Sequence, residues 1–243
     1  MSSYGPLAPW YDRLTQDVPY SQFADYYEAQ FQRSEGEFHL LLDLCCGTGT
    51  LTALMAQRGY EMIAADASVD MLMQARHKAA ALDIPPLFLL QDAAELDLYG
   101  TVDAAYCSLD GLNYLPPDTL PEVFRRLHLF VRPGGLFIFD LRTPEYLRSL
   151  DGQVFVDETD ELLCLWRADF DNAQRAIVYG MDLFSREKTL WRRSREEHVE
   201  YAHEPRQLEA LLHTAGFEDF RWSDRAISPC AGRIFLCCKR NIN

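Results

Sequence analysis

A glycine turn behind a short apolar run is the first stretch of the sequence whose residue types could support chemistry. Residues 41–50 read LLDLCCGTGT, so the carboxylate of Asp43 precedes the glycines Gly47 and Gly49. An apolar strand that enters a glycine turn and then a helix is typical of nucleotide sites, because the start of the helix presents free backbone N–H groups. A dinucleotide site also needs a third glycine or alanine for close helix packing, but Thr52 stands at that position. The stretch therefore predicts a nucleotide ligand, and a dinucleotide fits it poorly.

The carboxylate of Asp43 discriminates between the ligands that such a turn could hold. A pyrophosphate beside a carboxylate would be repelled, whereas a ligand with a cationic amine would be attracted. S-adenosylmethionine has such an amine and a sulfonium, and it has no phosphate. The residues of the turn therefore favour S-adenosylmethionine over NAD.

Five segments of the chain resemble the class I S-adenosylmethionine-dependent methyltransferases, in particular a subgroup that acts on small molecules. The glycine turn resembles the first motif of that family, with Cys45 where the family usually has its first glycine. The resemblance covers about residues 4–240 and implies S-adenosylmethionine as the cofactor. The other four segments are IAADASVDML (63–72), LLQDAAEL (89–96), VDAAYCSLDGLNYL (102–115) and LHLFVRPGGLFIFDL (127–141). The N-terminal YGPLAPWYDRLTQDVPY (4–20) and the later EEHVEY (196–201) and LLHTAGF (211–217) also fit that subgroup.

The resemblance also implies a set of cofactor-binding residues. Asp43 would lie near the methionine amine, and Asp66 would accept hydrogen bonds from both ribose hydroxyls, which suits the two oxygens of a carboxylate. Asp92 would read the adenine amino group, with the N–H of Ala93 toward the ring and Met71 packed on the adenine face. The full set is Tyr11, Tyr20, Asp43, Gly47, Gly49, Asp66, Met71, Asp92, Ala93 and Ser108.

Each of these residues also has a purely structural interpretation. Asp43 and Asp66 could cap or hold the helices that follow them, and Asp92 could be an ordinary loop acid. Met71 could belong to the core, and the two N-terminal tyrosines could simply pack a helical lead-in. These alternatives stay open from the sequence.

The segment after the expected fourth strand is where the methyl acceptor should lie, because ligands of an open α/β sheet bind outside the carboxyl ends of its strands. Residues 107–114 read CSLDGLNY, and Asp110 and Asn113 are the predicted catalytic residues, which would orient or deprotonate the acceptor. Alternatively, Asp110 belongs to a simple turn and Asn113 caps a helix. His198 lies on a strand-like segment that could face the cleft, although a core or solvated histidine is the commoner case.

The alternation of strands and helices predicts the fold class α/β, with a doubly wound, mostly parallel seven-stranded Rossmann-like sheet. Residues 1–37 are expected to form a helical lead-in, and Pro133-Gly134-Gly135 a turn. The expected strands are 38–44, 60–66, 87–90, 102–109, 136–141, 217–222 and 233–240, and the expected helices are 50–58, 69–82, 118–131 and 206–215.

Residues 151–201 break this pattern and form an expected insertion. Four long segments alternate with period two, which predicts an antiparallel β-meander inserted between core segments 1–150 and 202–243. Aromatic residues of the meander could cover the acceptor as a lid, or they could bury a homodimer interface. Its basic cluster, which includes Arg192, Arg193 and Arg195, is interpreted as a solvated face paired with nearby acids.

Composition limits the class of protein and its partners. The formal net charge is −14, which argues against a nucleic-acid partner, and no apolar run reaches the roughly 20 residues of a membrane span. The first residues lack the pattern of a signal peptide, so we expect a cytoplasmic protein without a membrane partner. The seven cysteines contain no CxxC spacing and are expected to be free, with no metal site.

The leading functional hypothesis is a methyltransferase that transfers a methyl group to N or O of a small-molecule acceptor by in-line displacement. One alternative is a methyltransferase-like protein that binds the cofactor but serves regulation or interaction without catalysis. A second alternative is an NAD-dependent oxidoreductase, against which Asp43 and Thr52 argue.

Overall fold

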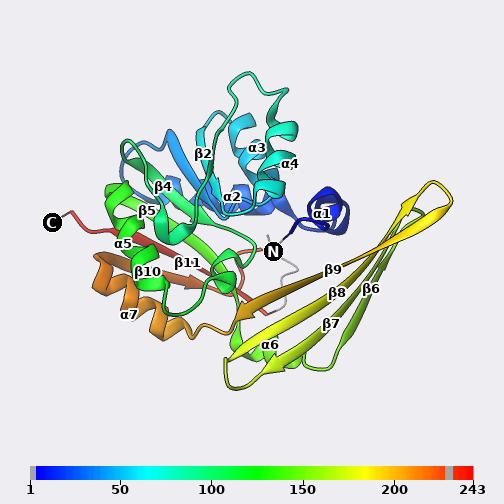
Figure 1. Ribbon diagram of the computed structural model, residues 1–243. Coiled ribbons are helices and arrows are strands. Elements are labelled where there is room, and N and C mark those ends of the chain that lie inside the picture. Colours follow the sequence, from blue (N-terminus) through cyan, green and yellow to red (C-terminus); the bar gives the residue numbers. More distant parts are fainter. Residues whose placement is uncertain (1–3, 228–231, 243) are drawn as a thin grey trace.

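The chain folds into a large open sheet covered by helices on both faces and a second, smaller sheet that projects to one side (Figure 1). The structure is a computed structural model that describes residues 4–227 and 232–242. No helix in the described part of the chain is long and apolar enough to cross a membrane. The predicted fold class, a mostly parallel Rossmann-like sheet with an added antiparallel meander, is confirmed.

The large sheet has seven strands in the order β10-β11-β5-β4-β1-β2-β3. Strands β1 to β5 pair with one another in parallel, whereas β11 runs antiparallel to both of its neighbours, β5 and β10. Because β1 lies between β2 and β4, the connections after these strands lead to opposite sides, which creates a crevice at their carboxyl ends. The strands are β1 Leu40–Leu44, β2 Glu61–Asp66, β3 Leu87–Leu90, β4 Val102–Cys107, β5 Val131–Arg142, β10 Phe217–Ser223 and β11 Arg233–Arg240.

Helices cover both faces of this sheet because its central strands carry apolar side chains on both sides. Leu42 and Phe137 pack into the cluster that contains α5 (Leu120–Phe130) and α7 (Pro205–Ala215). Their strand neighbours Leu41 and Ile138 point to the other face, toward helix α2. The helices on that face are α2 Tyr20–Arg33, α3 Thr50–Gln57 and α4 Val69–Ala79.

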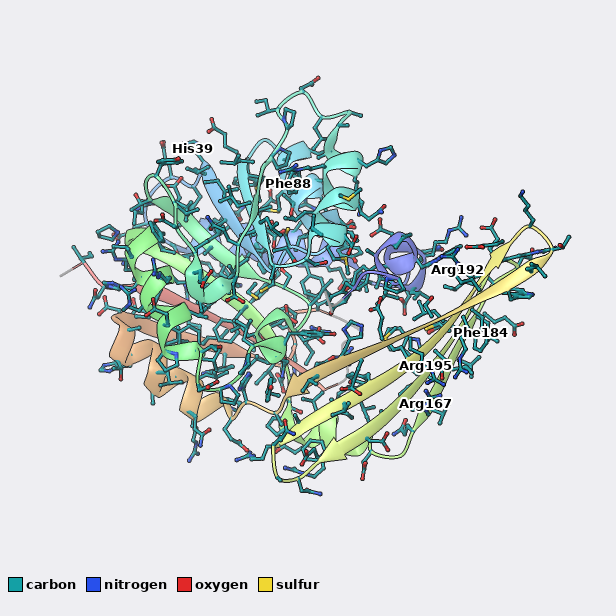
Figure 2. The ribbon with its side chains drawn as sticks, in the orientation of Figure 1. His39, Phe88, Arg167, Phe184, Arg192 and Arg195 are labelled. Carbon is teal, nitrogen blue, oxygen red and sulfur yellow. The ribbon has the colours of Figure 1, made fainter. Side chains whose placement is uncertain are left out.

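The second sheet is an antiparallel meander in the order β6-β7-β8-β9. One face packs on helix α1 (Ala8–Leu14), where Leu7 meets Met181 and Leu183, and near its other end on helix α6 (Pro144–Ser149), which the sequence analysis did not predict. Figure 2 shows Arg167, Phe184 and Arg195 on this sheet, away from the seven-stranded sheet. The strands are β6 Val154–Glu158, β7 Leu162–Asp171, β8 Ala176–Glu187 and β9 Leu190–Tyr201.

All eleven expected strands form, with ends within a few residues of the expected ones. The prediction of a turn at residues 133–135 is wrong. The chain does not reverse there, because these residues lie inside strand β5. The pairing of β4 with β5 shifts register there, and Gly134 takes a positive φ of 76°. Proline and glycine are common both in turns and at irregular positions of a continuous strand, so the sequence alone did not distinguish the two.

The cysteines in the described part of the chain are unpaired, and Cys230 lies outside the described residues. Four of them, Cys107, Cys164, Cys237 and Cys238, are buried. No three His, Cys, Asp or Glu side chains among the described residues are grouped so that they could hold a metal ion.

Candidate active site

A cavity of about 490 Å³ opens at the carboxyl ends of β1 to β4, in the crevice that the strand order creates. Its lining comes from two groups of segments. One group contains the loops that follow β1, β2 and β3. The other contains the N-terminal segment, the short helix η2 (Gly111–Tyr114) with its flanking residues, and the end of β9. Of the predicted cofactor residues, those that line the cavity are Tyr11, Tyr20, Asp43, Gly47, Asp66, Met71, Asp92, Ala93 and Ser108.

The glycine turn is held in the left-handed region of φ, which explains its composition. Cys45, Gly47 and Gly49 have φ values of 59°, 55° and 68°, a range that glycine adopts without strain. A Cβ on Gly49 would stand 2.9 Å from the Cβ of Ala75, so Gly49 allows α4 to approach the turn and does not itself line the cavity. A Cβ on Gly47 would meet no atom within 4 Å, so the space beside this cavity-lining glycine is open for a ligand.

Asp43 is the last residue but one of β1, and its buried carboxylate lines the cavity. Its Oδ2 accepts a hydrogen bond of 2.5 Å from the hydroxyl of Thr52, the residue that departs from the dinucleotide fingerprint. Burial raises the pKa of Asp43 to about 7, although the hydrogen bond from Thr52 opposes the rise. A cationic group in the cavity would stabilise the ionised form of this carboxyl, whereas a phosphate would oppose it.

Asp66 ends β2 and binds two backbone N–H groups with its two oxygens. Oδ2 accepts from Gly47 N and Oδ1 accepts from Ser68 N, each at 2.8 Å. The cap of helix α4 is Ser68, which accepts from Met71 N, so Asp66 is not the cap that the alternative interpretation required. Burial raises the pKa of Asp66, and these two backbone bonds limit the rise. Each oxygen keeps a lone pair that can accept a ligand hydroxyl.

The loop after β3 supplies Asp92 and Ala93. Asp92 is exposed and caps the short helix η1 (Ala93–Glu95) by accepting from Ala94 N at 2.8 Å. Met71, from α4, is buried and lines the cavity as well. Met71, Asp92 and Ala93 therefore all line the cavity.

Helix α1, which carries Tyr11, lies over the glycine turn. Asp12 accepts a hydrogen bond of 2.6 Å from the hydroxyl of Thr48 and pairs with Lys78 of α4 at 2.8 Å. Ser108, after β4, is joined to Tyr27 of α2 by a hydrogen bond of 2.6 Å. The sequence analysis did not identify Asp12, because its partners stand more than 30 residues away in the chain.

The wall opposite the cofactor motifs is aromatic. The ring of Tyr4 lies 4.4 Å from that of His198, 6.0 Å from that of Tyr114 and 6.2 Å from that of Tyr11. All four rings line the cavity, and Tyr114 and Tyr4 were not predicted. The alternation in EEHVEY put His198 on one face of its strand, but only the packing of β9 shows that this face meets the cavity.

Nε2 of His198 is 2.9 Å from Oε2 of Glu196, two residues earlier on the same face of β9. The other oxygen of Glu196 accepts from the backbone N–H of Leu7 at 2.7 Å. Since a carboxylate accepts, Nε2 of His198 carries the proton and Nδ1 carries the lone pair.

Asp110 and Asn113 lie beneath this wall and do not line the cavity. Asp110 pairs with Arg233 at 2.8 Å and with Arg142 at 3.4 Å. Burial alone would raise the pKa of Asp110. The guanidinium groups of Arg233 and Arg142 lower this pKa by more than burial raises it, so the net shift is downward. Arg233 also pairs with the buried Asp140, which accepts from the backbone N–H of Asp110 at 3.0 Å.

Asn113 is fully buried and ties three segments together. Its Nδ2 donates to the carbonyl of Tyr201 at 2.9 Å, and its Oδ1 accepts from the N–H of Arg142 at 3.1 Å. Neither residue offers a group to the cavity, so the arrangement suits positioning of the loop after β4 more than contact with an acceptor.

Comparisons with known proteins agree with this geometry. A family model described as "Methyltransferase domain" matches residues 41–135. The chain is 26% identical to "Putative methyltransferase YqeM" of Bacillus subtilis (strain 168), with coverage of 98% of this chain and 97% of that protein. It is 31% identical to the glycine N-methyltransferase of Rattus norvegicus over 46% of this chain and 43% of that protein.

Among solved structures, the chain resembles an S-adenosylmethionine-dependent methyltransferase from Clostridium acetobutylicum ATCC 824. The TM-score is 0.86 at 27% identity, and the match covers 98% of this chain and 99% of that one. The match extends over the β-meander as well as the core, since it leaves almost none of the chain out. With the glycine turn, the acids after β1 to β3 and the open space beside Gly47, these matches show that the chain is a class I S-adenosylmethionine-dependent methyltransferase.

Proposed function

We propose that the protein transfers the methyl group of S-adenosylmethionine to a nitrogen or oxygen atom of a small molecule bound against the aromatic wall. The observation that carries the proposal is the composition of one cavity. Cofactor motifs line one end, and Tyr4, Tyr114 and His198 line the opposite wall. The sugar N-methyltransferase KedS8 from Streptoalloteichus sp. ATCC 53650 has the same fold, with a TM-score of 0.81 at 19% identity over 95% of this chain and 92% of that one. The sugar in its name supports a small molecule as the acceptor of this protein.

We propose that Asp43, Gly47, Asp66 and the loop of Asp92 and Ala93 hold the cofactor. Asp43 would face its amine, Asp66 its ribose and Asp92 its adenine. The cofactor supplies an activated methyl carbon, so the protein has to align the acceptor and exclude water. The tyrosines of α1 and of the segment before it cover the cavity and serve the second task.

His198 is our proposed general base. Its Nδ1 has no hydrogen-bond partner among the described residues, while Glu196 fixes the ring through Nε2. Leu7 N in turn holds Glu196, so the base is attached to the N-terminal cover. This assignment replaces Asp110 and Asn113 as acceptor-contacting residues. We propose that these two position the segment that carries Ser108 and Tyr114.

The meander contributes to the acceptor site in this proposal, and its lid role is favoured over the interface role. Glu197, His198 and Val199 of β9 line the cavity, whereas the exposed edge strand β6 does not. A homodimer through the outer face stays a prediction, which light scattering of the purified protein would test. A partner of nucleic acid stays disfavoured by the net charge of −14.

The test is the release of S-adenosylhomocysteine from S-adenosylmethionine in the presence of a panel of metabolites, with mass spectrometry of the products. We expect one class of compound to stimulate release and to gain 14 mass units per transfer. Tight cofactor binding without stimulation by any compound of the panel would favour the non-catalytic alternative. Tighter binding of NAD than of S-adenosylhomocysteine would contradict the cofactor site.

A further inference from the structure

The charges around the cavity are of one sign. Asp43, Asp66, Asp92 and Glu197 line it, and no lysine or arginine does so among the described residues. The residues outside the described ranges include no lysine or arginine either. The cavity therefore has no side-chain cation with which to bind a phosphate or carboxylate of an acceptor.

Three cations close to the lining residues already have carboxylate partners. Lys78 pairs with Asp12, and Arg142 and Arg233 pair with Asp110, while Arg233 also binds Asp140. Turning any of them toward a ligand would leave a carboxylate without its partner, which is costly where the carboxylate is buried. An anionic acceptor would thus have to bind beside the acids of the cavity without compensation.

The aromatic wall provides what a cation needs. Tyr4 and Tyr114 have ring centroids 6.0 Å apart, and His198 lies 4.4 Å from Tyr4. Ring faces attract an ammonium group through their quadrupole, and the attraction is strongest where water is excluded. The three rings pack on one another and form a continuous aromatic surface on the cavity.

A buried acid behind the wall would respond to a bound cation. Oε2 of Glu200 is buried with no hydrogen-bond partner among the described residues. Burial is the main reason that the pKa of Glu200 rises to about 8, and Asp110 raises it further. An adjacent cation would stabilise the ionised form of this carboxyl.

We propose that the methyl acceptor is an amine, which binds as a cation against Tyr4, Tyr114 and His198. The proposal rests on the proposed function and narrows its acceptor from N or O to N. Anionic acceptors are excluded by the lack of a cationic partner. A hydroxyl acceptor would lose a proton and develop negative charge on oxygen, and this wall offers no cation to stabilise that charge.

The reaction balances with the groups in the cavity. An ammonium acceptor first gives one proton to Nδ1 of His198 and becomes a neutral amine. The lone pair of the amine nitrogen forms the new C–N bond while the C–S bond breaks and its electron pair stays on sulfur. The positive charge passes from sulfur to nitrogen and never leaves the site, so the acids of the cavity stabilise it before and after transfer. The proton on His198 then leaves to solvent.

The test uses the full-length protein saturated with S-adenosylhomocysteine, whose affinity is measured first by calorimetry. The probes are choline and 3,3-dimethyl-1-butanol, which have the same shape but differ by the positive charge, with acetate as an anionic probe. We expect choline to bind at least tenfold more tightly than its neutral isostere, and acetate not to bind. Equal binding of the two isosteres, tighter binding of acetate or no binding of choline would each overturn the proposal.

Variants locate the binding of choline. Tyr114→Leu should lower the affinity for choline by about 3- to 30-fold, which corresponds to the range of a cation–π contact. Tyr114→Phe keeps the ring and should retain most of the affinity. The control is Tyr99→Leu, at a fully exposed tyrosine outside the cavity. An unchanged affinity for choline in Tyr114→Leu, with S-adenosylhomocysteine still bound, would remove Tyr114 from the site.

A second arm tests turnover and separates the two levels of the proposal. A bacterial metabolite extract is divided by ion exchange into cationic, neutral and anionic fractions, each supplied with S-adenosylmethionine. We expect the cationic fraction alone to stimulate release of S-adenosylhomocysteine. Release with only the neutral or anionic fraction would overturn the amine proposal and leave the methyltransferase intact. Failure of the protein to bind S-adenosylhomocysteine at all would instead contradict the proposed function.

Discussion

The two ends of the cavity are built in different ways. The cofactor end uses residues between 43 and 93 that lie at or just beyond the carboxyl ends of β1, β2 and β3, where backbone positions are set by neighbouring strands. The acceptor wall combines Tyr4, Tyr114 and His198, which come from the N-terminal segment, from η2 and from β9. The first end needs only one sheet, whereas the second needs three segments far apart in sequence to meet. The family resemblance is therefore concentrated at the first end, and the acceptor specificity should depend on the second.

The largest effect that would sharpen this contrast is expected at His198. His198→Gln removes the base but leaves every cofactor contact, so kcat should fall by roughly 10²- to 10⁴-fold with unchanged affinity for S-adenosylhomocysteine. Steady-state kinetics with an identified acceptor and calorimetry of the same preparation measure the two quantities. His213→Gln, on helix α7 and outside the cavity, is the control. Wild-type turnover of the His198 variant would show that the wall only holds the acceptor.

A second contrast concerns two acid–arginine clusters, one buried under the wall and one on the meander. Arg233 is 7% exposed and serves both Asp110 and Asp140, whereas Asp182 is shared by three arginines whose side chains are 47–70% exposed. Arg233→Met leaves the buried Asp140 without a cationic partner and Asp110 with only the longer pair to Arg142, and should lower the free energy of unfolding by about 3–5 kcal/mol.

Arg195→Met is the matched change on the meander. It leaves two arginines on Asp182, so we expect a loss below about 1 kcal/mol. Urea unfolding of both variants measures the difference. Equal losses would mean that the buried cluster contributes no more to stability than the exposed one.

At the cofactor end, Asp66→Asn should weaken binding of S-adenosylhomocysteine by roughly 10- to 100-fold. The amide replaces one accepting oxygen by a donor, which would face either a ribose hydroxyl or the backbone N–H of Gly47 or Ser68. Calorimetry measures the change, and Asp97→Asn, at an exposed acid outside the cavity, serves as the control. If Asp66→Asn binds as tightly as the wild type, the ribose assignment is wrong.

The smallest effect is a pH dependence of cofactor binding. Because burial raises the pKa of Asp43 to about 7, most of this carboxyl is protonated at pH 6 in the free protein. A bound amine favours the ionised form, so affinity for S-adenosylhomocysteine should rise roughly eightfold from pH 6 to pH 7.5 and release a proton. Calorimetry in buffers of different ionisation enthalpy measures the proton.

Asp43→Asn should bind more weakly and lose this pH dependence. In the free protein the same shift has the opposite consequence for stability. The folded-state pKa lies above the unfolded value of 3.8, so this carboxyl lowers stability as pH rises from about 4 to about 7. A pH dependence of binding that persists in Asp43→Asn would assign it to another group.

The sequence by itself determined the strands, the glycine turn and the acids after β1 to β3. These are local features: an apolar run forms a buried strand, and the next polar residue falls at the edge of a parallel sheet. Cys45 could be recognised as a departure from the family pattern, and the structure shows why glycine is usual there, because the residue takes a positive φ of 59°.

Only the tertiary structure decided which residues face the acceptor. From the sequence, Asp110 was predicted to be a free polar residue beside the methyl group of the cofactor. In the structure it pairs with Arg233, which lies 123 residues later in the chain. No local sequence pattern reveals a charge pair at that separation. In EEHVEY the period-two alternation put Glu196, His198 and Glu200 on one face of a strand, but a strand has two faces. The packing of that face on Leu7 and Tyr4 turned His198 toward the cavity, because apolar burial against helix α1 selected which side of the meander points inward.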